Sequence, residues 1–203
     1  NRATHGSGGA IYSSNEISIS ADTGSTFAHN HATDGGALFA ATGGIILDGS
    51  FSFVDNRAGA GGGALYTESS GITLSKGPYE FSGNSSSSDG GGAIFSTNGI
   101  TISGETGSTF TKNHATWGGA LFAASGGIIL DGSFSFVDNS AWAGGALYSE
   151  FSDISLLKGP YEFSGNRADG PGGAIWSKND ITISGGSGST FTHNYANTNG
   201  GAL

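Results

Sequence analysis

The chain has 203 residues, 39 of them Gly, and carries a net charge of −9 with only 7 Lys plus Arg. So few cations, with no basic stripe, argue against a nucleic-acid or anionic-membrane partner, since phosphate groups are bound by clustered Lys and Arg. The absence of Cys excludes disulfides and thiolate zinc sites, and no apolar run reaches the roughly 18 residues of a membrane-spanning helix.

A short phrase, Phe-x-x-Asn followed by Gly-Gly-Ala, returns along the whole chain. It reads "FAHNHATDGGALFA" at 27–40 and "FTKNHATWGGALFA" at 110–123. Three unlike units of about 27 residues form a super-repeat of 81–83 residues, so that 36–56 and 119–139 are almost identical. We therefore expect 1–203 to be one continuous segment of a longer repeat array. The start at an Asn and the absence of Met favour the same interpretation.

Each unit contains three strand-like segments in a constant order. The first follows Gly-Gly, as in "GALFA"; the second has apolar residues two apart, as in "ITIS"; the third ends at the Phe, as in "PYEF". Apolar alternation with β-branched and aromatic residues is typical of strands, and Gly, Asn, Ser and Asp mark the corners. Stacked in register, these segments predict an all-β fold, a parallel β-helix (β-solenoid) with three strands per rung and roughly seven rungs. We expect a right-handed coil from the usual chirality of parallel crossovers.

Side-chain alternation predicts three inward-facing columns. The first begins with Ile17 and Ile19 and continues through the aliphatic pairs of later rungs. The second is a Phe column, stacked face over edge: Phe27, Phe53, Phe81, Phe110, Phe136, Phe163 and Phe191. The third is Ile11, Leu38, Leu65, Ile94, Leu121, Leu147 and Ile175.

The repeated Asn should form a ladder along the axis. Phe and Asn three residues apart cannot share a strand face, so the chain must turn between them. Asn tolerates left-handed backbone, and stacked amides can hydrogen-bond from rung to rung. Gly-Gly then supplies the next corner, where a side chain would crowd the neighbouring rungs. The predicted ladder is Asn30, Asn56, Asn84, Asn113, Asn139, Asn166 and Asn194.

A further aromatic column follows the third inward column by one residue, and by parity it faces outward. It is Tyr12, Phe39, Tyr66, Phe95, Phe122, Tyr148 and Trp176. Contiguous exposed apolar surface often marks association, whereas loops folded over the column would make it a second core layer; the sequence supports both readings. With the loop tryptophans added, the candidate interaction residues are Tyr12, Tyr66, Trp117, Trp142, Tyr148 and Trp176.

Charged residues precede the ladder Asn in several units. His29 with Asp55, and Lys112 with Asp138, should be neighbours one rung apart. A His–Asp pair near Ser residues could suggest catalysis, but an oriented nucleophile and an oxyanion site are also needed. Because Lys replaces His in the equivalent place, we interpret both pairs as weak surface ion pairs.

The remaining carboxylates repeat at equivalent positions. Asp48 and Asp131 lie three rungs apart, as do Glu80 and Glu162, so they cannot converge into the paired carboxylates of a glycosidase. The nonapeptide pattern of calcium-binding repeats is missing, and we interpret Asp48-Gly49 and Asp131-Gly132 as hairpin-like turns. We therefore expect no enzyme activity, no catalytic residues, no metal and no cofactor.

Repeated Phe-x-x-Asn followed by Gly-Gly-Ala-(Ile/Leu/Val) resembles the passenger domain of chlamydial polymorphic membrane proteins, over the entire chain. The resemblance implies a secreted autotransporter passenger, a right-handed β-helix on the bacterial cell surface that mediates adhesion. The super-repeat is more regular than expected of such adhesins, which leaves a second hypothesis: a subunit of a self-assembling extracellular filament.

Under either hypothesis the expected location is extracellular, on the bacterial cell surface. The expected partners are receptors on host or neighbouring cells, together with continuation of the same chain or end-to-end self-association to cover unpaired strand edges.

Overall fold

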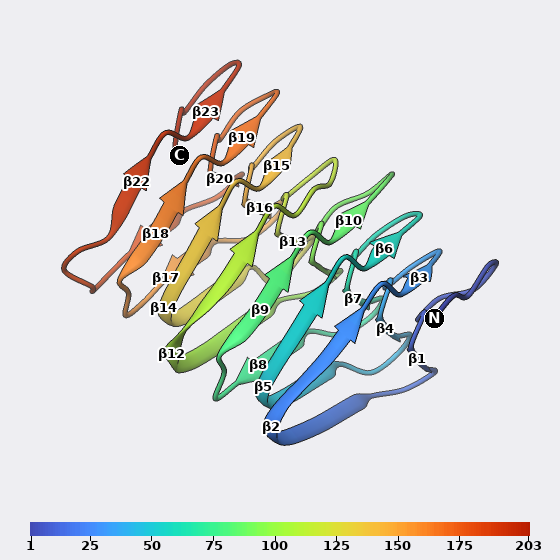
Figure 1. The fold of residues 1–203 in the computed structure, drawn as a ribbon. Helices are drawn as coiled ribbons and strands as arrows, with labels where there is room; N and C mark the ends of the chain where they lie inside the picture. Colours follow the sequence, from blue (N-terminus) through green and yellow to red (C-terminus); the bar gives the residue numbers. More distant parts are fainter.

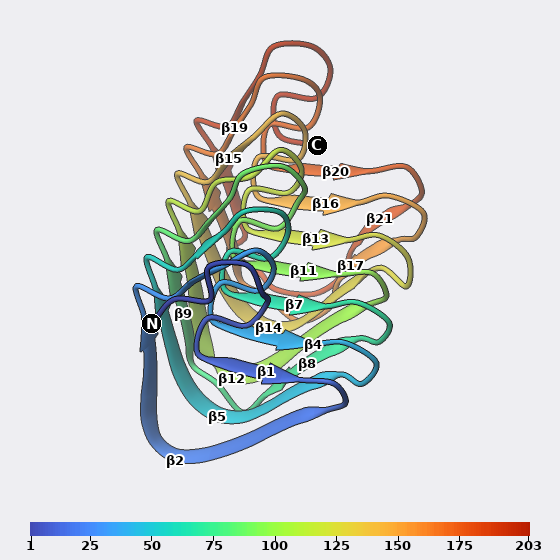
Figure 2. The same ribbon diagram turned by 90° about the vertical axis from the view of Figure 1, so that its right-hand side faces the viewer.

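The computed structural model describes residues 1–203, apart from the side chains of Glu105 and Thr106. Its strands coil around one axis in stacked turns, with the two termini at opposite ends of the rod (Figure 1). Seen from the N-terminal end, the chain runs clockwise as it recedes, so the coil is right-handed (Figure 2). The predicted parallel β-solenoid of about 27 residues per turn and about seven turns is confirmed. No helix in the described part of the chain could span a membrane.

Two large parallel sheets form the walls of the coil. One has seven short strands: β1 (Ile11–Ser13), β4 (Leu38–Ala40), β7 (Leu65–Thr67), β11 (Ile94–Ser96), β13 (Leu121–Ala123), β16 (Leu147–Ser149) and β20 (Ile175–Ser177). The other has ten: β2 (Ile17–Ala28), β5 (Ile45–Val54), β8 (Ile72–Ser75), β9 (Tyr79–Ser82), β12 (Ile100–Thr111), β14 (Ile128–Val137), β17 (Ile154–Leu156), β18 (Tyr161–Ser164), β21 (Ile181–Ile183) and β22 (Thr190–Thr192).

Two small sheets of two-residue strands follow the ladder Asn, where sequence reasoning expected only a corner. They are β3 (His31–Ala32), β6 (Arg57–Ala58) and β10 (Ser85–Ser86), then β15 (Ser140–Ala141), β19 (Arg167–Ala168) and β23 (Tyr195–Ala196). Their inward residues are small, mostly Ala, and buried in all but the last rung. The loops that begin with these strands project to one side of the rod (Figure 1).

In several rungs the second and third predicted segments join into one long strand. In β2, β5, β12 and β14 the second and third segments are continuous, and Figure 2 shows β2 and β5 bending around a corner of the coil. Asp48-Gly49 therefore lies inside β5 and is not a hairpin-like turn. Gly49 has φ +117° beside a register shift in the pairing with β2, so a bulge bends the strand and pairing resumes beyond it. Asp131-Gly132 occupies the same place in β14, with Gly132 at φ +146°.

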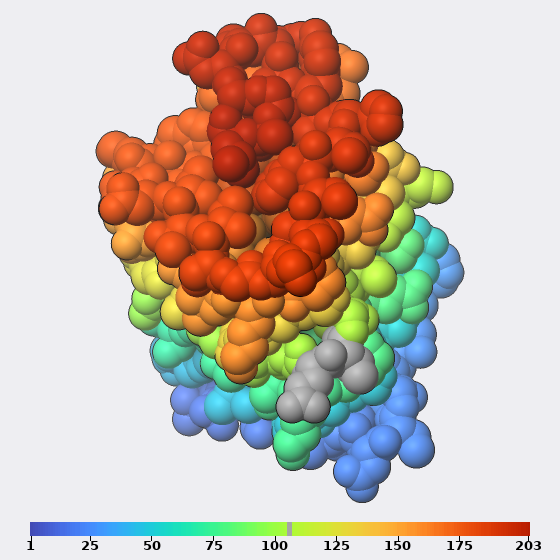
Figure 3. Space-filling view, turned by 90° about the vertical axis from the view of Figure 1, so that its left-hand side faces the viewer, coloured from blue at the N-terminus to red at the C-terminus, as the bar shows by residue number. Residues whose placement is uncertain are grey.

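The three predicted inward columns form the core. Register pairs Ile17 with Ile45 and Phe27 with Phe53, so identical positions lie directly over one another. Middle-rung members such as Leu47 and Phe81 are fully buried. Figure 3 shows the C-terminal end of the rod from outside. Ile183, in the last turn, is 39% exposed because that turn has a neighbour on one side only.

The Phe rings stack with their planes nearly parallel, which corrects the expected face-over-edge arrangement. Their centroids lie 4.8–5.1 Å apart and their planes differ by at most 11°. Parallel strands in register repeat the same backbone every 4.7–4.9 Å or so, and each ring therefore adopts the orientation of the ring below it.

The Asn side chains form a continuous hydrogen-bonded ladder, and Asn113 is representative of the buried middle. Its Oδ1 accepts from both the backbone N–H and the Nδ2 of Asn84, each at 3.0 Å. Its Nδ2 donates to Asn139 Oδ1 and to the carbonyl of Phe81, also at 3.0 Å. The amide is thus fully satisfied inside the protein, as buried polar groups require.

The left-handed residue at this corner is the one before the Asn, not the Asn itself. His29, Asp55, Lys112 and Asp138 have φ between 51° and 55°. This local turn lets the Asn point inward to the ladder, while the preceding side chain stays at the surface. The structure thereby corrects the expectation that the ladder residue itself would be left-handed.

The two glycines of each Gly-Gly have different physical roles. The first is left-handed, for example Gly91 at φ +66°, where an added Cβ would also collide with the carbonyl of Ile94. The second has no unusual φ, but a Cβ on Gly92 would collide with the carbonyl of Gly119 in the next rung. The sequence analysis predicted a corner at Gly-Gly. The spacing between rungs determines how much room a side chain would have there.

Asn113→Ala should lower the free energy of unfolding by about 2–4 kcal/mol, because the buried N–H of Asn84 and the carbonyl of Phe81 lose their side-chain partner. Urea denaturation measures the change. The control is Asn15→Ala at an exposed position, where the loss should stay below about 0.5 kcal/mol. Equal effects at both positions would refute a stabilising ladder.

Gly91→Ala should destabilise by at least about 2 kcal/mol, from the left-handed backbone together with the collision at Ile94. Gly24→Ala is the matched control: its φ is not left-handed and the nearest atom to a new Cβ, Ser50 Oγ, lies 3.8 Å away. Thermal unfolding of the two variants compares them directly. A Gly91→Ala protein as stable as the control would contradict this account of the corner.

Candidate interaction surface

The outer aromatic column lies on the outward face of the seven-stranded sheet. Its first members stack in sequence: Tyr12 on Phe39 at 5.5 Å, Phe39 on Tyr66 at 5.2 Å, and Tyr66 on Phe95 at 4.8 Å. Tyr12, at the end of the rod, is 58% exposed, whereas Phe39 is 5% exposed. Exposure therefore differs along the column, from the open N-terminal end to buried rings such as Phe39.

The loop that precedes each Gly-Gly provides the cover. A Cβ on Gly61 would collide with the Phe95 ring, and one on Gly90 with the Phe122 ring, so these rings lie directly against loop backbone. Phe95, Phe122 and Tyr148 are only 6–8% exposed and pack together as a second cluster outside the main core. In the middle rungs, these aromatic rings therefore form a second core layer beneath the loops.

The six candidate interaction residues consequently lie in three different environments. Tyr12 and Trp142 are exposed, at 58% and 50%. Tyr66, Trp117 and Trp176 are half-buried. Tyr148 is buried between Trp117 and Trp176, so its expected surface exposure is wrong. A further exposed aromatic, which the sequence pattern did not single out, is Phe151, whose ring centroid lies 4.9 Å from Lys178 Nζ.

The ion pairs differ in part from those predicted. His29 Nδ1 lies 3.9 Å from Asp55 Oδ2, with both side chains exposed. Among the described residues no ion pair within 4.0 Å joins Lys112 and Asp138. Both keep the same left-handed backbone as His29 and Asp55, so the difference lies in the side chains alone.

Two equivalent ion pairs were missed although the sequence contains the signal. Lys76 Nζ is 2.7 Å from Asp48 Oδ2, and Lys158 is 3.2 Å from Asp131. The Lys of each "KGP" follows the Asp-Gly by 27 or 28 residues, which is one rung. The hydrogen bond from Lys76 lowers the pKa of Asp48, and the same bond raises the pKa of Lys76.

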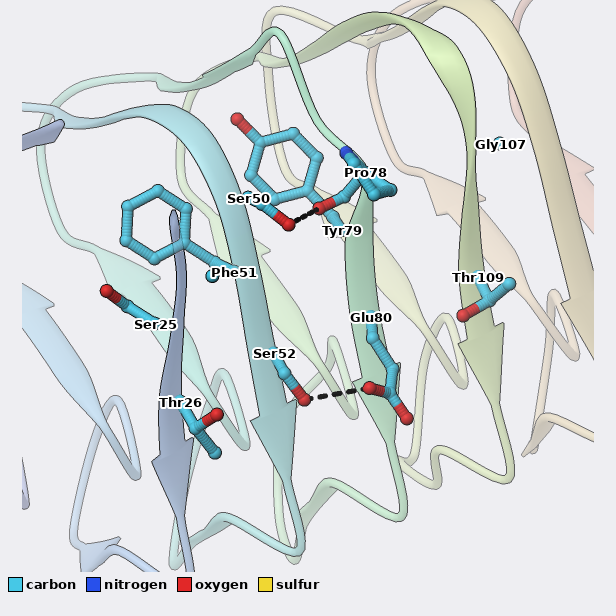
Figure 4. Close-up of a pocket in the computed structure, with 11 residues that line it drawn as sticks. Ser25, Thr26, Ser50, Phe51, Ser52, Pro78, Tyr79, Glu80, Gly107 and Thr109 are labelled. Carbon is cyan, nitrogen blue, oxygen red and sulfur yellow. Dashed lines mark hydrogen bonds between the residues drawn. The ribbon is translucent and has the colours of Figure 1, made fainter. Parts of the chain in front are cut away.

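A shallow pocket of about 310 Å³ lies on the ten-stranded sheet, where the chain bends (Figure 4). Ser52 Oγ donates to Glu80 Oε2 at 2.9 Å, and Ser50 Oγ donates to the Pro78 carbonyl at 3.2 Å. The same pocket returns three rungs later at about 360 Å³, with Ser135 donating to Glu162 at 2.7 Å.

Each copy is lined by a single carboxylate, Glu80 or Glu162, among the residues described. Paired carboxylates about 5–9.5 Å apart are what glycoside cleavage requires. Asp48 and Asp131 lie elsewhere and are engaged by lysines. The geometry thus offers repeated polar contacts and no acid–base pair.

Four segments, residues 50–68, 78–97, 107–124 and 160–178, match the family model of the Chlamydia polymorphic membrane protein repeat. The chain carries this repeat. Each matched segment contains one Phe of the inward column, one ladder Asn and one Gly-Gly corner, so each match to the polymorphic membrane protein repeat covers one rung of the Phe and Asn columns and the Gly-Gly corner that follows. The family implies association with the outer membrane or cell surface, and it is not a known enzyme family. The searches of curated proteins and of solved structures found no match.

Tyr79 lies inside the coil behind the first polar pocket. Its hydroxyl is 2.8 Å from the Leu47 carbonyl and 2.5 Å from the Ser75 carbonyl, and the ring is 1% exposed. Burial raises the pKa of Tyr79 to about 12, against an ordinary 10.0, because the low-dielectric core disfavours the phenolate. Tyr66 and Tyr148 also have a pKa raised to about 12, chiefly by burial.

Stability should therefore fall as the pH rises from about 10 to 12. The unfolded chain loses the phenol protons near pH 10 while the folded chain retains them, so the stabilisation is complete below pH 10 and is lost as the pH rises through the folded pKa. For Tyr79→Phe the fall should be shallower by up to roughly 2 kcal/mol at pH 12. Urea denaturation at several pH values tests this, and an unchanged slope in the variant would contradict it.

Proposed function

We propose that this chain is a non-enzymatic extracellular segment of an autotransporter-like bacterial surface protein, and that it acts by reach and display. A rigid rod would present loops and aromatic side chains to host or neighbouring cells. The observation that carries the proposal is that the matched repeats coincide with the Phe and Asn ladders that hold the rungs together.

Rigidity and reach follow from the stacking. Rungs lie about 4.8 Å apart, so seven of them span about 30 Å along the axis, and every further rung lengthens the rod by the same amount. The ladder amides and stacked rings are buried through the middle rungs, which opposes bending between turns. Length in such a protein can change by duplication of whole units, as the near-identity of 36–56 and 119–139 illustrates.

Among the residues that the structure describes, no group of unlike catalytic side chains converges at one place, which supports the non-enzymatic part of the proposal. Carboxylates recur at equivalent places in successive super-repeats, and the two polar pockets are copies of each other. An active site needs unlike groups brought together at one place. Repetition favours many weak contacts along the rod instead.

A second function, the subunit of a repetitive extracellular filament, is favoured by the direction of the ladder. From Asn30 to Asn166, each Nδ2 donates to the Oδ1 of the following rung. One end of the rod therefore complements the other, and copies would stack head to tail in an open assembly. This alternative gives the same chain a structural role with no receptor.

The test combines location with binding. Antibodies against this segment, applied to intact and permeabilised producing cells, should label both equally. Beads coated with the purified chain should adhere to host or neighbouring cells, and beads coated with heat-denatured chain serve as the control. Labelling only after permeabilisation would overturn the surface role.

Sedimentation over a range of concentrations separates the two functions. A rod for display should stay the same size while its beads adhere. Concentration-dependent fibres without adhesion would support the filament and overturn the adhesive role.

A further inference from the structure

All three tryptophans lie in the second super-repeat, at positions where the first has other residues. Trp117 corresponds to Asp34, Trp142 to Gly59 and Trp176 to Phe95. The surrounding segments are nearly the same in both copies, and both build the same rungs. The fold itself therefore does not require tryptophan at these positions.

The tryptophans gather at one place on the outer face. Trp117 lies 4.8 Å from Trp142, edge to face, and 5.2 Å from Tyr148 at a tilt of 45°. Tyr148 in turn stacks on Trp176 at 4.5 Å. Residues separated by up to 59 positions in the sequence thus form one continuous aromatic cluster.

Trp117 interrupts the outer aromatic column. One and two rungs earlier, glycine occupies its place, and the rings of Phe95 and Phe122 lie against that backbone and stack at 16° to each other. The indole of Trp117 fills the corresponding space below the next ring. Tyr148 is consequently turned by 85° relative to Phe122.

A pocket of about 480 Å³ opens at this interruption. Aromatic rings of Tyr66, Phe95, Trp117, Phe122 and Tyr148 line it, together with Ala124 and the carboxyl-bearing residues Asp89 and Glu150. Neither acid is in an ion pair among the described residues. Lys178, one rung beyond Glu150, lies over the Phe151 ring instead.

The charge around the pocket is negative. The pKa of Tyr66 is raised first by burial and then by Asp34, Glu68 and Asp89, and Glu150 adds to the same effect at Tyr148. A neutral or anionic ligand gains nothing from these carboxylates. A cation gains from them and from the electron-rich ring faces.

We propose that this aromatic pocket binds an organic cation of the alkylammonium class. Its methyl or methylene groups would contact the rings, and its charge would be balanced by Asp89 and Glu150. Aromatic walls with an acidic rim suit such a ligand because the positive charge is spread over an apolar surface. The binding does not depend on whether the rod is an adhesin or a filament.

Titration of the purified chain with choline tests the proposal, with tryptophan fluorescence and calorimetry as readouts. The neutral isostere 3,3-dimethylbutan-1-ol has the same shape without the charge and should bind at least about fivefold more weakly. N-acetyl-trimethyllysine amide and a trimethyllysine peptide form a second arm. Tighter binding of the peptide than of choline would identify a protein side chain as the source of the cation, whereas equal binding would favour a free small cation.

Two variants locate the site. Asp89→Asn combined with Glu150→Gln should weaken choline binding about fivefold or more while the neutral isostere is unaffected. Trp117→Gly introduces the residue found at the same place in the two preceding rungs, which both fold, and should reduce binding by a similar factor. Glu16→Gln makes the same kind of charge change at a remote exposed position and should leave binding unchanged.

The proposal is overturned if choline gives no signal at concentrations on the order of 10 mM, which corresponds to negligible affinity. It is also overturned if the neutral isostere binds as tightly as choline, since the pocket would then be merely apolar. Choline binding that survives both site variants would place the interaction elsewhere and likewise reject it.

Discussion

The in-register stacking of parallel strands is the constraint on which this protein depends. Each turn is placed directly over the one before, at the spacing of a β-ladder, and every side chain therefore meets copies of itself. That arrangement favours residues which bond or pack with their own kind. Asn amides do so by donating and accepting at once, and Phe rings do so by offset stacking. A charged residue at the same positions would meet like charges along the whole rod.

The corners impose a second requirement. At each corner the chain must change direction without occupying more than one strand spacing along the axis, because the next rung lies directly above. Gly91 and its equivalents adopt left-handed backbone, while Gly92 and its equivalents leave room for the next turn. The residue before each ladder Asn is also left-handed, which directs the amide inward. These local geometries explain why the matched family repeat is a short phrase around Asn and Gly-Gly and not a full turn. The rest of each turn can vary provided that the inward positions remain apolar.

Function in such a rod can come from contacts that repeat along it or from residues that depart from the repeat. The polar pockets at Glu80 and Glu162 are duplicates, and duplicated contacts suit avidity or spacing along an array. The tryptophan cluster has no counterpart in the first super-repeat, and there the outer column is broken and a pocket opens. Comparison of the two super-repeats therefore separates residues that the fold requires from residues, such as the tryptophans, that the fold does not require.

The sequence alone determined the rung length, the parallel coil, the inward columns and the positions of the ladder Asn, because strict repetition at about 27 residues forces equivalent residues to lie over one another. Only the tertiary structure decided how exposed each of these equivalent residues is and how its side chain is oriented against its neighbours. The cover over Phe95, Phe122 and Tyr148 depends on where a loop folds back, and the rotation of Tyr148 depends on the volume of one indole. Likewise, whether two strand segments join across Gly49 depends on a bulge, which periodicity does not encode. Repetition specifies which residues meet along the axis, whereas contacts between strand and loop within a rung depend on volumes and backbone angles that appear only in three dimensions.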